Sequence, residues 1–248
     1  RLSGANLTEL EKAVGLSKGT VHTYMTTLQS LGLVRKENGL YQLGIRFITI
    51  SEYVRNELDI YSAGREEIGL LAKRTGDHAH LVIESNGFMV VIYETCGEHA
   101  VATDYHLRMR ETHQQLHQSA AGKSILAHLP NDRAEKILSD LNFVPKTENT
   151  ITSLENLRNE LEAVREQGYS INDEEEVGGI RSVGAPIQNY NEEVVGAVSM
   201  SATTSRLQDE RFEEVVPEMV METANIIEVN LEAIQFNQNK RADSAQPW

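Results

Sequence analysis

Residues 13–34, AVGLSKGTVHTYMTTLQSLGLV, have the pattern of the second half of a helix-turn-helix. Residues 8–11, TELE, form a capping box that predicts the start of the first helix, and Gly15 supplies the turn residue that ends it. Ser17 can cap the second helix. Apolar residues of that helix recur at spacings of three and four and predict one buried stripe: Val21, Tyr24, Met25, Leu28 and Leu31.

The opposite face of the second helix is small, polar and basic at its N-terminal end. The N-terminal end of a recognition helix enters the DNA major groove, where bulky or acidic side chains are excluded by shape or by phosphate repulsion. We therefore expect this face to contact double-stranded operator DNA, through Ser17, Lys18, Gly19, Thr20, His22 and Thr23.

The residues that follow predict the wing of a winged helix. Residues 32–34, GLV, close the helix and start a strand, residues 37–39, ENG, are a turn signal, and residues 40–43, LYQL, alternate as a return strand. Arg35 and Lys36 put positive charge at the base of this hairpin, and we expect both to contact DNA. The alternative is a small helical domain that makes protein contacts.

Charge is unevenly distributed along the chain. The 248 residues contain 23 Lys and Arg against 37 Asp and Glu, a formal net charge of −14. Residues 1–50 carry six basic and three acidic residues, so this segment is +3 and the remainder is −17. The sequence therefore predicts a basic DNA-binding segment attached to an acidic remainder. Such acidity suits a protein kept soluble in a high-salt cytoplasm. At high salt, phosphate neutralisation contributes little to affinity, so base-edge and shape contacts must supply more of it.

Composition also indicates the compartment. The single cysteine, Cys96, excludes an internal disulfide and fits a reducing compartment. No apolar run approaches the roughly 20 residues needed to span a bilayer, and no signal peptide is visible. We expect a cytoplasmic chain with no membrane partner. We also expect it to be shortened at its N-terminus, because there is no room before Asn6 for the first helix of a winged-helix core.

Residues 45–60 predict a linker helix between a DNA-binding domain at 1–44 and a second domain at 61–236. Apolar residues recur at spacings of three and four along this segment: Phe47, Ile50, Val54 and Leu58. Such a seam pairs with its twin, so we expect a homodimer, with a tetramer left open. A dimer places two recognition helices on one face of DNA about a helical turn apart, or a multiple of it.

Residues 61–236 are predicted to mix α and β structure, and the polar tail at 237–248 to be disordered. Asn86-Gly87 is a strong hairpin signal between two strands, and Ser153 and Gly168 bound one of the helices. The expected helices are 61–74, 120–129, 132–140, 154–167 and 211–234, and the expected strands are 79–84, 88–95, 100–105, 183–188 and 194–201.

Three motifs in this order resemble the IclR family of transcription regulators: residues 15–34; residues 116–127, LHQSAAGKSILA; and residues 166–187, EQGYSINDEEEVGGIRSVGAPI, followed by 194–202, VVGAVSMSA. The resemblance implies an α+β chain with an N-terminal winged helix-turn-helix, a dimerising linker helix and a C-terminal GAF/PAS-like domain. In that domain a curved antiparallel sheet with helices would bind a small metabolite. By position, the resemblance implies effector contacts near Gln114, Ala120, Ala121, Asn172, Ser182, Ser199 and Ser201.

The chain departs from the family's pattern at three positions, two of them among these effector contacts. The family often has Asp where Asn172 stands and Cys where Ser182 stands, and an Arg is common in the recognition helix where this chain has Thr23. The first two departures bear on the identity of the ligand. The third weakens one expected DNA contact.

The residues themselves also support a pocket. Ser119 can cap a helix that begins with Ala120 and Ala121, where small residues let a ligand approach free backbone N–H groups and the helix dipole favours an anion. Ser199 and Ser201 stand at i and i+2 of a strand and share one face. We expect this cradle to bind a small organic acid, a carboxylate. The alternative is that Ser119 is only a cap and the serines bond to each other or to water.

Two other motifs are weaker. Residues 122–124, GKS, end like a phosphate-binding P-loop, but the first glycine of that loop would stand at His117. Residues 173–176, DEEE, could hold a cation, yet in an acidic chain such a run favours a solvated loop.

Histidines suggest a metal site only weakly. His113 and His117 are four residues apart, and His78, His80 and Cys96 lie on neighbouring predicted strands. Without a second cysteine or a dense cluster, the sequence favours ordinary surface and core histidines. We therefore expect no metal and no cofactor.

Two further classes of protein stay open. An enzyme would use Cys96 or Ser119 as nucleophile and His80 or His117 as base, but no nucleophile elbow, zinc motif or nucleotide loop supports it. A scaffold would bind a protein partner through its acidic face. The sequence favours a DNA-binding regulator controlled by a metabolite, and does not name the metabolite, the operator or the sign of control.

Overall fold

The computed structural model describes residues 4–101 and 114–244. By its internal contacts the chain divides into two compact units, one running up to Leu58 and the other from Asp59 onward. Each unit has its own hydrophobic core.

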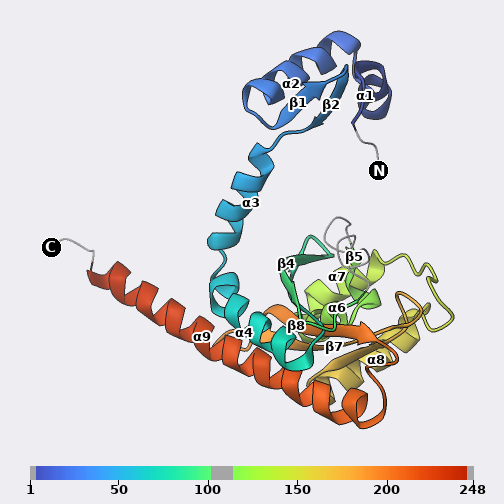
Figure 1. Ribbon diagram of the computed structural model, residues 1–248, viewed down its shortest axis with the longest axis vertical. Coiled ribbons are helices and arrows are strands. Elements are labelled where there is room, and N and C mark those ends of the chain that lie inside the picture. The colour runs from blue at the N-terminus through green and yellow to red at the C-terminus, as the bar shows by residue number, and fades with distance from the viewer. Residues whose placement is uncertain (1–3, 102–113, 245–248) are drawn as a thin grey trace. The chain divides into compact units, whose positions relative to one another are not determined.

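The first unit is a helix-turn-helix followed by a two-stranded hairpin (Figure 1). Val21 and Met25 of its second helix and Tyr41 of the hairpin form the core. Asn38 and Gly39 at the hairpin tip have φ angles of 50° and 81°, as a two-residue turn between twisted strands requires. The predicted helix-turn-helix with its wing is therefore confirmed. Its elements are α1 (Leu7–Val14), α2 (Lys18–Ser30), β1 (Val34–Glu37), β2 (Leu40–Leu43) and α3 (Arg46–Asn56).

Two details of the predicted first unit are wrong. The capping box is formed by Asn6 and not by Thr8, because the Asn6 side chain accepts from the N–H groups of Thr8 and Glu9, both at 3.0 Å, and the Glu9 carboxylate accepts from Asn6 N–H at 2.7 Å. Tyr24 and Leu31 are 57% and 45% exposed. Both side chains lie beside the buried stripe. In this small unit, the fully buried part of the stripe consists of Val21 and Met25, which pack with Tyr41.

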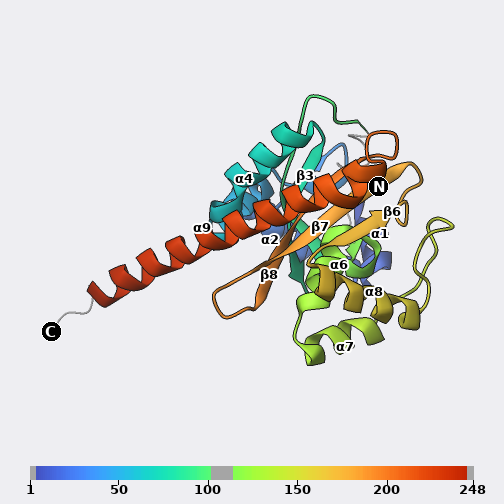
Figure 2. The same ribbon diagram turned by 90° about the horizontal axis from the view of Figure 1, so that it is seen from below.

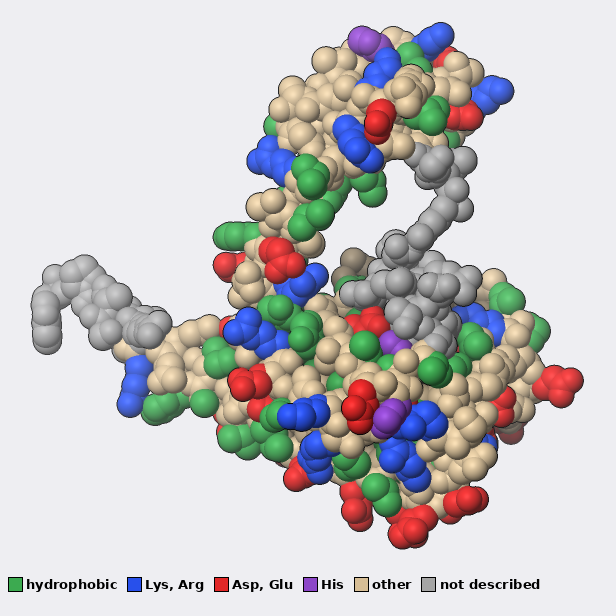
Figure 3. Space-filling model, viewed as in Figure 1, with side chains coloured by type: hydrophobic (Ala, Val, Ile, Leu, Met, Phe, Trp, Pro, Cys, Tyr) green, Lys and Arg blue, Asp and Glu red, His purple; other side chains and the backbone are tan. Residues whose placement is uncertain are grey.

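Helix α3 carries an exposed apolar face, and hydrophobic side chains gather along it in Figure 3. Phe47, Ile50 and Val54 are 43%, 38% and 54% exposed. The helix ends at Asn56, so Leu58 does not continue the seam, contrary to expectation. It is half-buried in the break before α4 (Asp59–Thr75).

The second unit is built on a six-stranded antiparallel sheet with the strand order β5-β4-β3-β8-β7-β6. The hairpin predicted around Asn86-Gly87 forms, and the strands expected at 183–188 and 194–201 pair with each other as a second hairpin. The strands are β3 (His78–Ser85), β4 (Phe88–Cys96), β5 (Gln114–Gln115), β6 (Ser170–Asp173), β7 (Ile180–Gln188) and β8 (Val194–Thr203).

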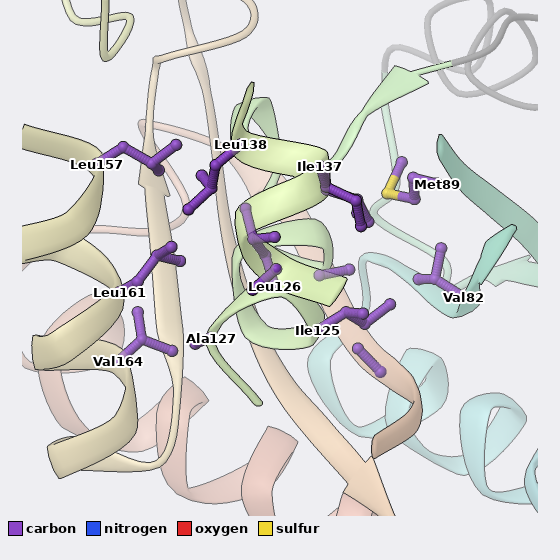
Figure 4. Close-up of a cluster of buried hydrophobic side chains, with 14 residues drawn as sticks. Val82, Met89, Ile125, Leu126, Ala127, Ile137, Leu138, Leu157, Leu161 and Val164 are labelled. Atoms are coloured by element: carbon purple, nitrogen blue, oxygen red, sulfur yellow. The ribbon is translucent and has the colours of Figure 1, made fainter. Parts of the chain in front are cut away.

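Helices cover both faces of this sheet (Figures 1 and 2). Helices α4 and α9 lie side by side on one face, and α6 packs against the other face with α8 behind it. Ile125, Leu126 and Leu161 belong to the buried cluster that joins α6, α7 and α8 to the sheet (Figure 4). The helices are a 3-10 turn (Leu116–Gln118), α6 (Ala120–His128), α7 (Asn131–Ser139), α8 (Leu154–Gln167), a π-helical turn (Arg211–Val215) and α9 (Val216–Ser244).

The predicted α+β class is confirmed, but three element predictions need correction. The expected strand at 100–105 does not begin at Ala100 or Val101, and its remaining residues lie outside the described part of the chain. Strand β6 was not expected. The tail after Phe236 is not disordered up to residue 244, because α9 continues through it and Gln238 Nε2 donates to Asp59 Oδ1 at 2.8 Å. Across the described residues, no helix is both long and apolar enough to cross a membrane.

Candidate functional site

The start of α2 presents the predicted DNA-contacting residues to solvent. Ser17 caps the helix, since its hydroxyl accepts from Thr20 N–H at 3.3 Å and lies 2.9 Å from the Thr20 hydroxyl. Lys18, Gly19 and His22 are exposed. Thr20 is half-buried, and its hydroxyl group already makes one hydrogen bond to the cap, which leaves its methyl group and its remaining hydrogen-bonding capacity for other contacts.

The threonines farther along α2 also use their hydroxyl protons within the helix. Thr23 donates to Gly19 O at 3.1 Å, and Thr26 donates to His22 O at 2.9 Å. Each can still accept a hydrogen bond and offer a methyl group to a thymine. Tyr24, which the sequence assigned to the core, is exposed beside this row and adds a phenol to the surface. The sequence signal for this exposure is that Tyr24 lies at the margin of the apolar stripe.

The basic residues near the wing differ in their availability. The Arg35 side chain is 62% exposed, with a loose ion pair of 3.6 Å to Glu37. Lys36 Nζ lies 4.9 Å from the centre of the Tyr41 ring, which holds it against the hairpin. Arg46 donates to Leu31 O at 2.6 Å and so ties α3 to the end of α2. Figure 3 shows Lys and Arg side chains on the surface of this unit.

In the second unit, strand register places polar residues together on the α6 face of the sheet. Asn172, Ser182, Ser201 and His78 are successive partners across β6, β7, β8 and β3. A second row crosses the sheet beside the first, through Ser170, Gly184, Ser199, His80 and Glu94. Ser199 and Ser201 therefore share a face, as predicted.

Helix α6 begins directly above these rows. The Ser119 hydroxyl accepts from Gly122 N–H at 3.0 Å, which confirms the predicted cap, and it donates to Met89 Sδ at 3.0 Å. Strand β7 approaches the first turn so closely that a Cβ on Gly184 would lie 2.7 Å from the backbone carbon of Ala120. Glycine at 184 is therefore required for the helix N-terminus to reach the sheet.

A cavity lies between the first turn of α6 and the polar rows. Its volume is only about 10 Å³, hardly room for one water molecule, so its walls are nearly in contact. Six of the eight predicted effector residues line it: Ser119, Ala120, Ala121, Ser182, Ser199 and Ser201. His80 and Glu176 also line it and were not predicted, because their approach depends on pairings between distant strands and loops.

The other two predicted effector residues have different surroundings. Asn172 donates to Gln118 O at 2.7 Å and accepts from Glu175 N–H at 3.1 Å, so it fixes the loop after β6 to the start of α6. Gln114 is buried on β5 opposite Met89. Neither lines the cavity.

The acidic run 173–176 is not a solvated loop. Glu175 and Glu176 are buried, and Lys123, which is fully buried in α6, donates to Glu175 and to Glu160, each at 2.7 Å. Burial raises the pKa of Glu175, while the Lys123 ammonium acts in the opposite direction. Glu176 pairs with Lys146 at 3.1 Å. The loop is held because each of its two buried carboxylates, Glu175 and Glu176, pairs with a lysine from another segment.

Cations are scarce at the cavity itself. Arg181 points away from it, since its guanidinium pairs with Asp173 at 2.6 Å and stacks over the Phe212 ring, 4.7 Å from its centre. Among the described residues that line the cavity, none is Lys or Arg. Its hydrogen-bond donors are therefore the hydroxyl groups, His80 and the N–H groups at the start of α6.

His117 is buried in the 3-10 turn that precedes α6, with its ring 5.2 Å from that of Phe143. Burial lowers the pKa of His117 to about 4, and Lys146 and Lys123 act in the same direction. It is therefore neutral near pH 7. His113, its partner in the sequence pattern, lies outside the described residues.

Comparison with known proteins gives matches over most of the chain. Residues 2–38 match a family profile described as the IclR helix-turn-helix domain, and residues 52–229 match one described as Bacterial transcriptional regulator IclR C-terminal. A probable HTH-type transcriptional regulator ArcR of Halobacterium salinarum is 53% identical over 230 residues, covering 92% of this chain and 88% of the relative.

Two solved structures are also similar. The IclR protein of Thermotoga maritima has a TM-score of 0.70 and 28% identity, covering 93% of this chain and 92% of that one. An IclR homologue of Microbacterium hydrocarbonoxydans, complexed with 4-hydroxybenzoate, has a TM-score of 0.77 and 20% identity, covering 92% of each chain.

Proposed function

The chain belongs to the IclR family of transcriptional regulators, and on this premise we propose that its affinity for operator DNA is controlled by a small carboxylate. The carboxylate would bind in the cavity beneath α6. Members of the family are DNA-binding regulators with an effector-binding C-terminal domain and not enzymes, so the alternative of an enzyme using Cys96 or Ser119 falls away. Ser119 has the hydrogen bonds of a helix cap, and Cys96 is exposed at the end of β4.

The observation that carries the proposal is the convergence of hydroxyl groups with a helix N-terminus. Ser182, Ser199 and Ser201 face the first turn of α6, where N–H groups and the helix dipole favour negative charge. A carboxylate carries one charge and can be held by such donors, whereas a phosphate ester usually recruits several cations, which the described lining lacks. The 4-hydroxybenzoate bound by a relative of the same fold is a ligand of this class.

Glu176 adds a condition on the ligand. Its carboxylate lines the cavity and pairs with Lys146, so the ligand's own carboxylate should lie toward the serines and α6, with any hydroxyl group toward Glu176. The neutral Asn172 repels an anion less than the Asp often found there in the family. Ser182, in place of the family's Cys, contributes a stronger hydrogen-bond donor.

The nearly closed cavity supports control by a shift between two states. A ligand of more than a few atoms requires the walls to separate, so the liganded and ligand-free domains must differ. Binding then changes DNA affinity only to the extent that the two states bind the operator differently.

We also propose the DNA-bound form as a homodimer. The exposed apolar face of α3 supports pairing between two copies, which would present two recognition helices to two half-sites. Helix α9 exposes Ile226, Val229 and Phe236, which would suit a second interface in a tetramer. The acidic composition and the Halobacterium relative support function in a high-salt cytoplasm.

The experiment is selection of genomic DNA fragments on the full chain, followed by gel-shift of the retained fragment with a panel of small organic acids, matched amines and sugar phosphates. We expect one or a few fragments to be retained and an acid to change their affinity at least several-fold. Retention without sequence preference would contradict DNA reading. A best ligand that is cationic would contradict the carboxylate.

A further inference from the structure

We propose that His78, His80 and Glu94 form a binding site for a divalent first-row transition metal ion, zinc in the first instance, at the edge of the effector cavity. Among the described residues, these three form the one group whose ligand atoms approach closely enough to hold a metal, all within 4.8 Å of one another. Cys96, which the sequence placed beside these histidines, does not belong to the group.

Strand geometry brings the three side chains to one face. His78 and His80 are two residues apart on β3, so both point to the α6 side of the sheet. Glu94 is the direct partner of His80 on β4. Because adjacent antiparallel strands fix this register, the site rests on the rigid part of the fold and not on a loop.

The separations suit a metal. Zinc lies about 2.0–2.2 Å from nitrogen and oxygen ligands, so the ligand atoms of a tetrahedral ion are about 3.4 Å apart. His78 Nδ1 lies 3.4 Å from Glu94 Oε1. The third ligand atom lies within 4.8 Å of the other two. It must move by about an ångström to bind the same ion, and side-chain rotation can supply this shift.

The orientation of the His78 ring gives a second geometric argument. His78 Nδ1 faces Glu94, and Nε2, on the far side of the ring, lies 3.0 Å from Val101 O. Histidines that bind a metal through one ring nitrogen commonly hold the other against a backbone carbonyl, which fixes the orientation of the ring.

The second histidine and the burial favour the metal. The His80 ring also converges on His78 and Glu94, nearly parallel to the His78 ring at 13°. The side chains of His78 and Glu94 are 3% and 8% exposed, so an ion held between them would be shielded from water. Two imidazoles and a carboxylate with no thiolate are ligands that zinc and other late divalent metals accept.

The position has a consequence for the effector, which rests on the proposed function. His80 belongs to the metal group and also lines the cavity, and its Nδ1 lies 3.5 Å from the Ser199 hydroxyl. Three protein ligands leave a coordination position open, as in zinc sites that bind small molecules. The ion would supply the positive charge that the described lining lacks, and a ligand carboxylate is suited to that open position.

The test uses the full chain, stripped with a chelator, without DNA or effector, so that it stands apart from the proposed function. We expect calorimetric titration with Zn²⁺ to give one ion per chain with micromolar or tighter affinity, and Co²⁺ to give visible d–d absorption. His80→Asn and Glu94→Gln should each weaken binding at least tenfold. Cys96→Ser and His99→Asn, the latter at an exposed His beside Glu98, should bind as the parent does.

Three results would overturn the site. They are a parent protein that binds no Zn²⁺, unchanged affinity in both His80→Asn and Glu94→Gln, or loss of binding in Cys96→Ser. Circular dichroism checks that the variants fold. If they do not, X-ray absorption of the zinc-loaded parent decides, since we expect nitrogen and oxygen neighbours with the scattering of two imidazoles, and a sulfur neighbour would refute the site.

Discussion

The hydroxyl oxygens of Ser182 and Ser201 lie 2.9 Å apart, directly across the pair formed by β7 and β8. Each hydroxyl group can donate one hydrogen bond and accept others, so in the closed cavity one of them donates to the other. A ligand that accepts a hydrogen bond from one of them leaves the other to reorient. The alternative in which the serines merely bond to each other therefore describes the closed state and is compatible with ligand binding.

Filling the cavity should abolish the response to ligand. Ser199→Val together with Ala121→Leu removes one hydroxyl group and adds bulk at two lining positions, so no room is left beneath α6. We expect calorimetry to show no binding of the best organic acid, and gel-shift to show unchanged operator affinity in its absence. Ser205→Val, at an exposed serine after β8, is the matched control. Retained acid binding by the folded double variant would place the effector elsewhere.

Substitutions on α2 and the wing should separate specificity from general affinity. Thr20→Ala should relax discrimination between operator sequences, by about 1–3 kcal/mol if its methyl group reads a thymine. Lys18→Ala should lower affinity, and Arg35→Ala should weaken all sequences alike and reduce the salt dependence of binding. Lys136→Ala, at an exposed lysine of the second unit, serves as the control in gel-shift titrations. Unchanged binding in all three variants would mean that another surface reads DNA.

Charges placed on α3 should split the dimer. Ile50→Glu with Val54→Glu puts two carboxylates into the apolar face, where burial against a partner would be costly. Leu58, which lies outside the helix, is not a suitable target. We expect light scattering to show half the parent mass and operator binding to fall with it, while Ser51→Glu on the exposed polar side keeps both. A double variant with the parent mass would move the interface away from α3.

His117 should make the folded state sensitive to mild acid. Its pKa is about 4 in the folded chain against 6.5 when unfolded, so its contribution to stability is complete above pH 6.5 and is lost as the pH falls toward 4. The difference corresponds to about 3 kcal/mol at most. His117→Leu should flatten the fall in unfolding free energy over this range, measured by urea denaturation at several pH values, and His99→Gln should not. Parallel profiles for the parent and His117→Leu would refute this assignment.

Much of the fold follows from local signals. The Asn38-Gly39 and Asn86-Gly87 turns, the Ser17, Ser119 and Ser153 caps and the glycine ends at 15 and 168 all form where the sequence indicates them. Each depends on residues that are close to one another in the sequence, so it can be predicted without tertiary information.

The composition of the site was harder to predict, because it depends on residues far apart in the sequence. Ser199 meets His80 across 119 positions, and Lys123 meets Glu175 across 52. Local pattern predicted that the serines share a face, but not that His80 and Glu176 complete the wall. The run at 173–176 resembles a solvated loop until its lysine partners are placed beside it.

The buried lysine of α6 gives the two units different sensitivities to ionic strength. Lys123 is shielded from solvent, so mobile ions screen its attraction to Glu160 and Glu175 far less than they screen an exposed charge near a phosphate. In concentrated salt, the attachment of the acidic loop to α6 should persist while the electrostatic part of DNA binding fades. The second unit would thus keep its structure over a range of salinity in which DNA binding by the first unit depends increasingly on contacts with the bases.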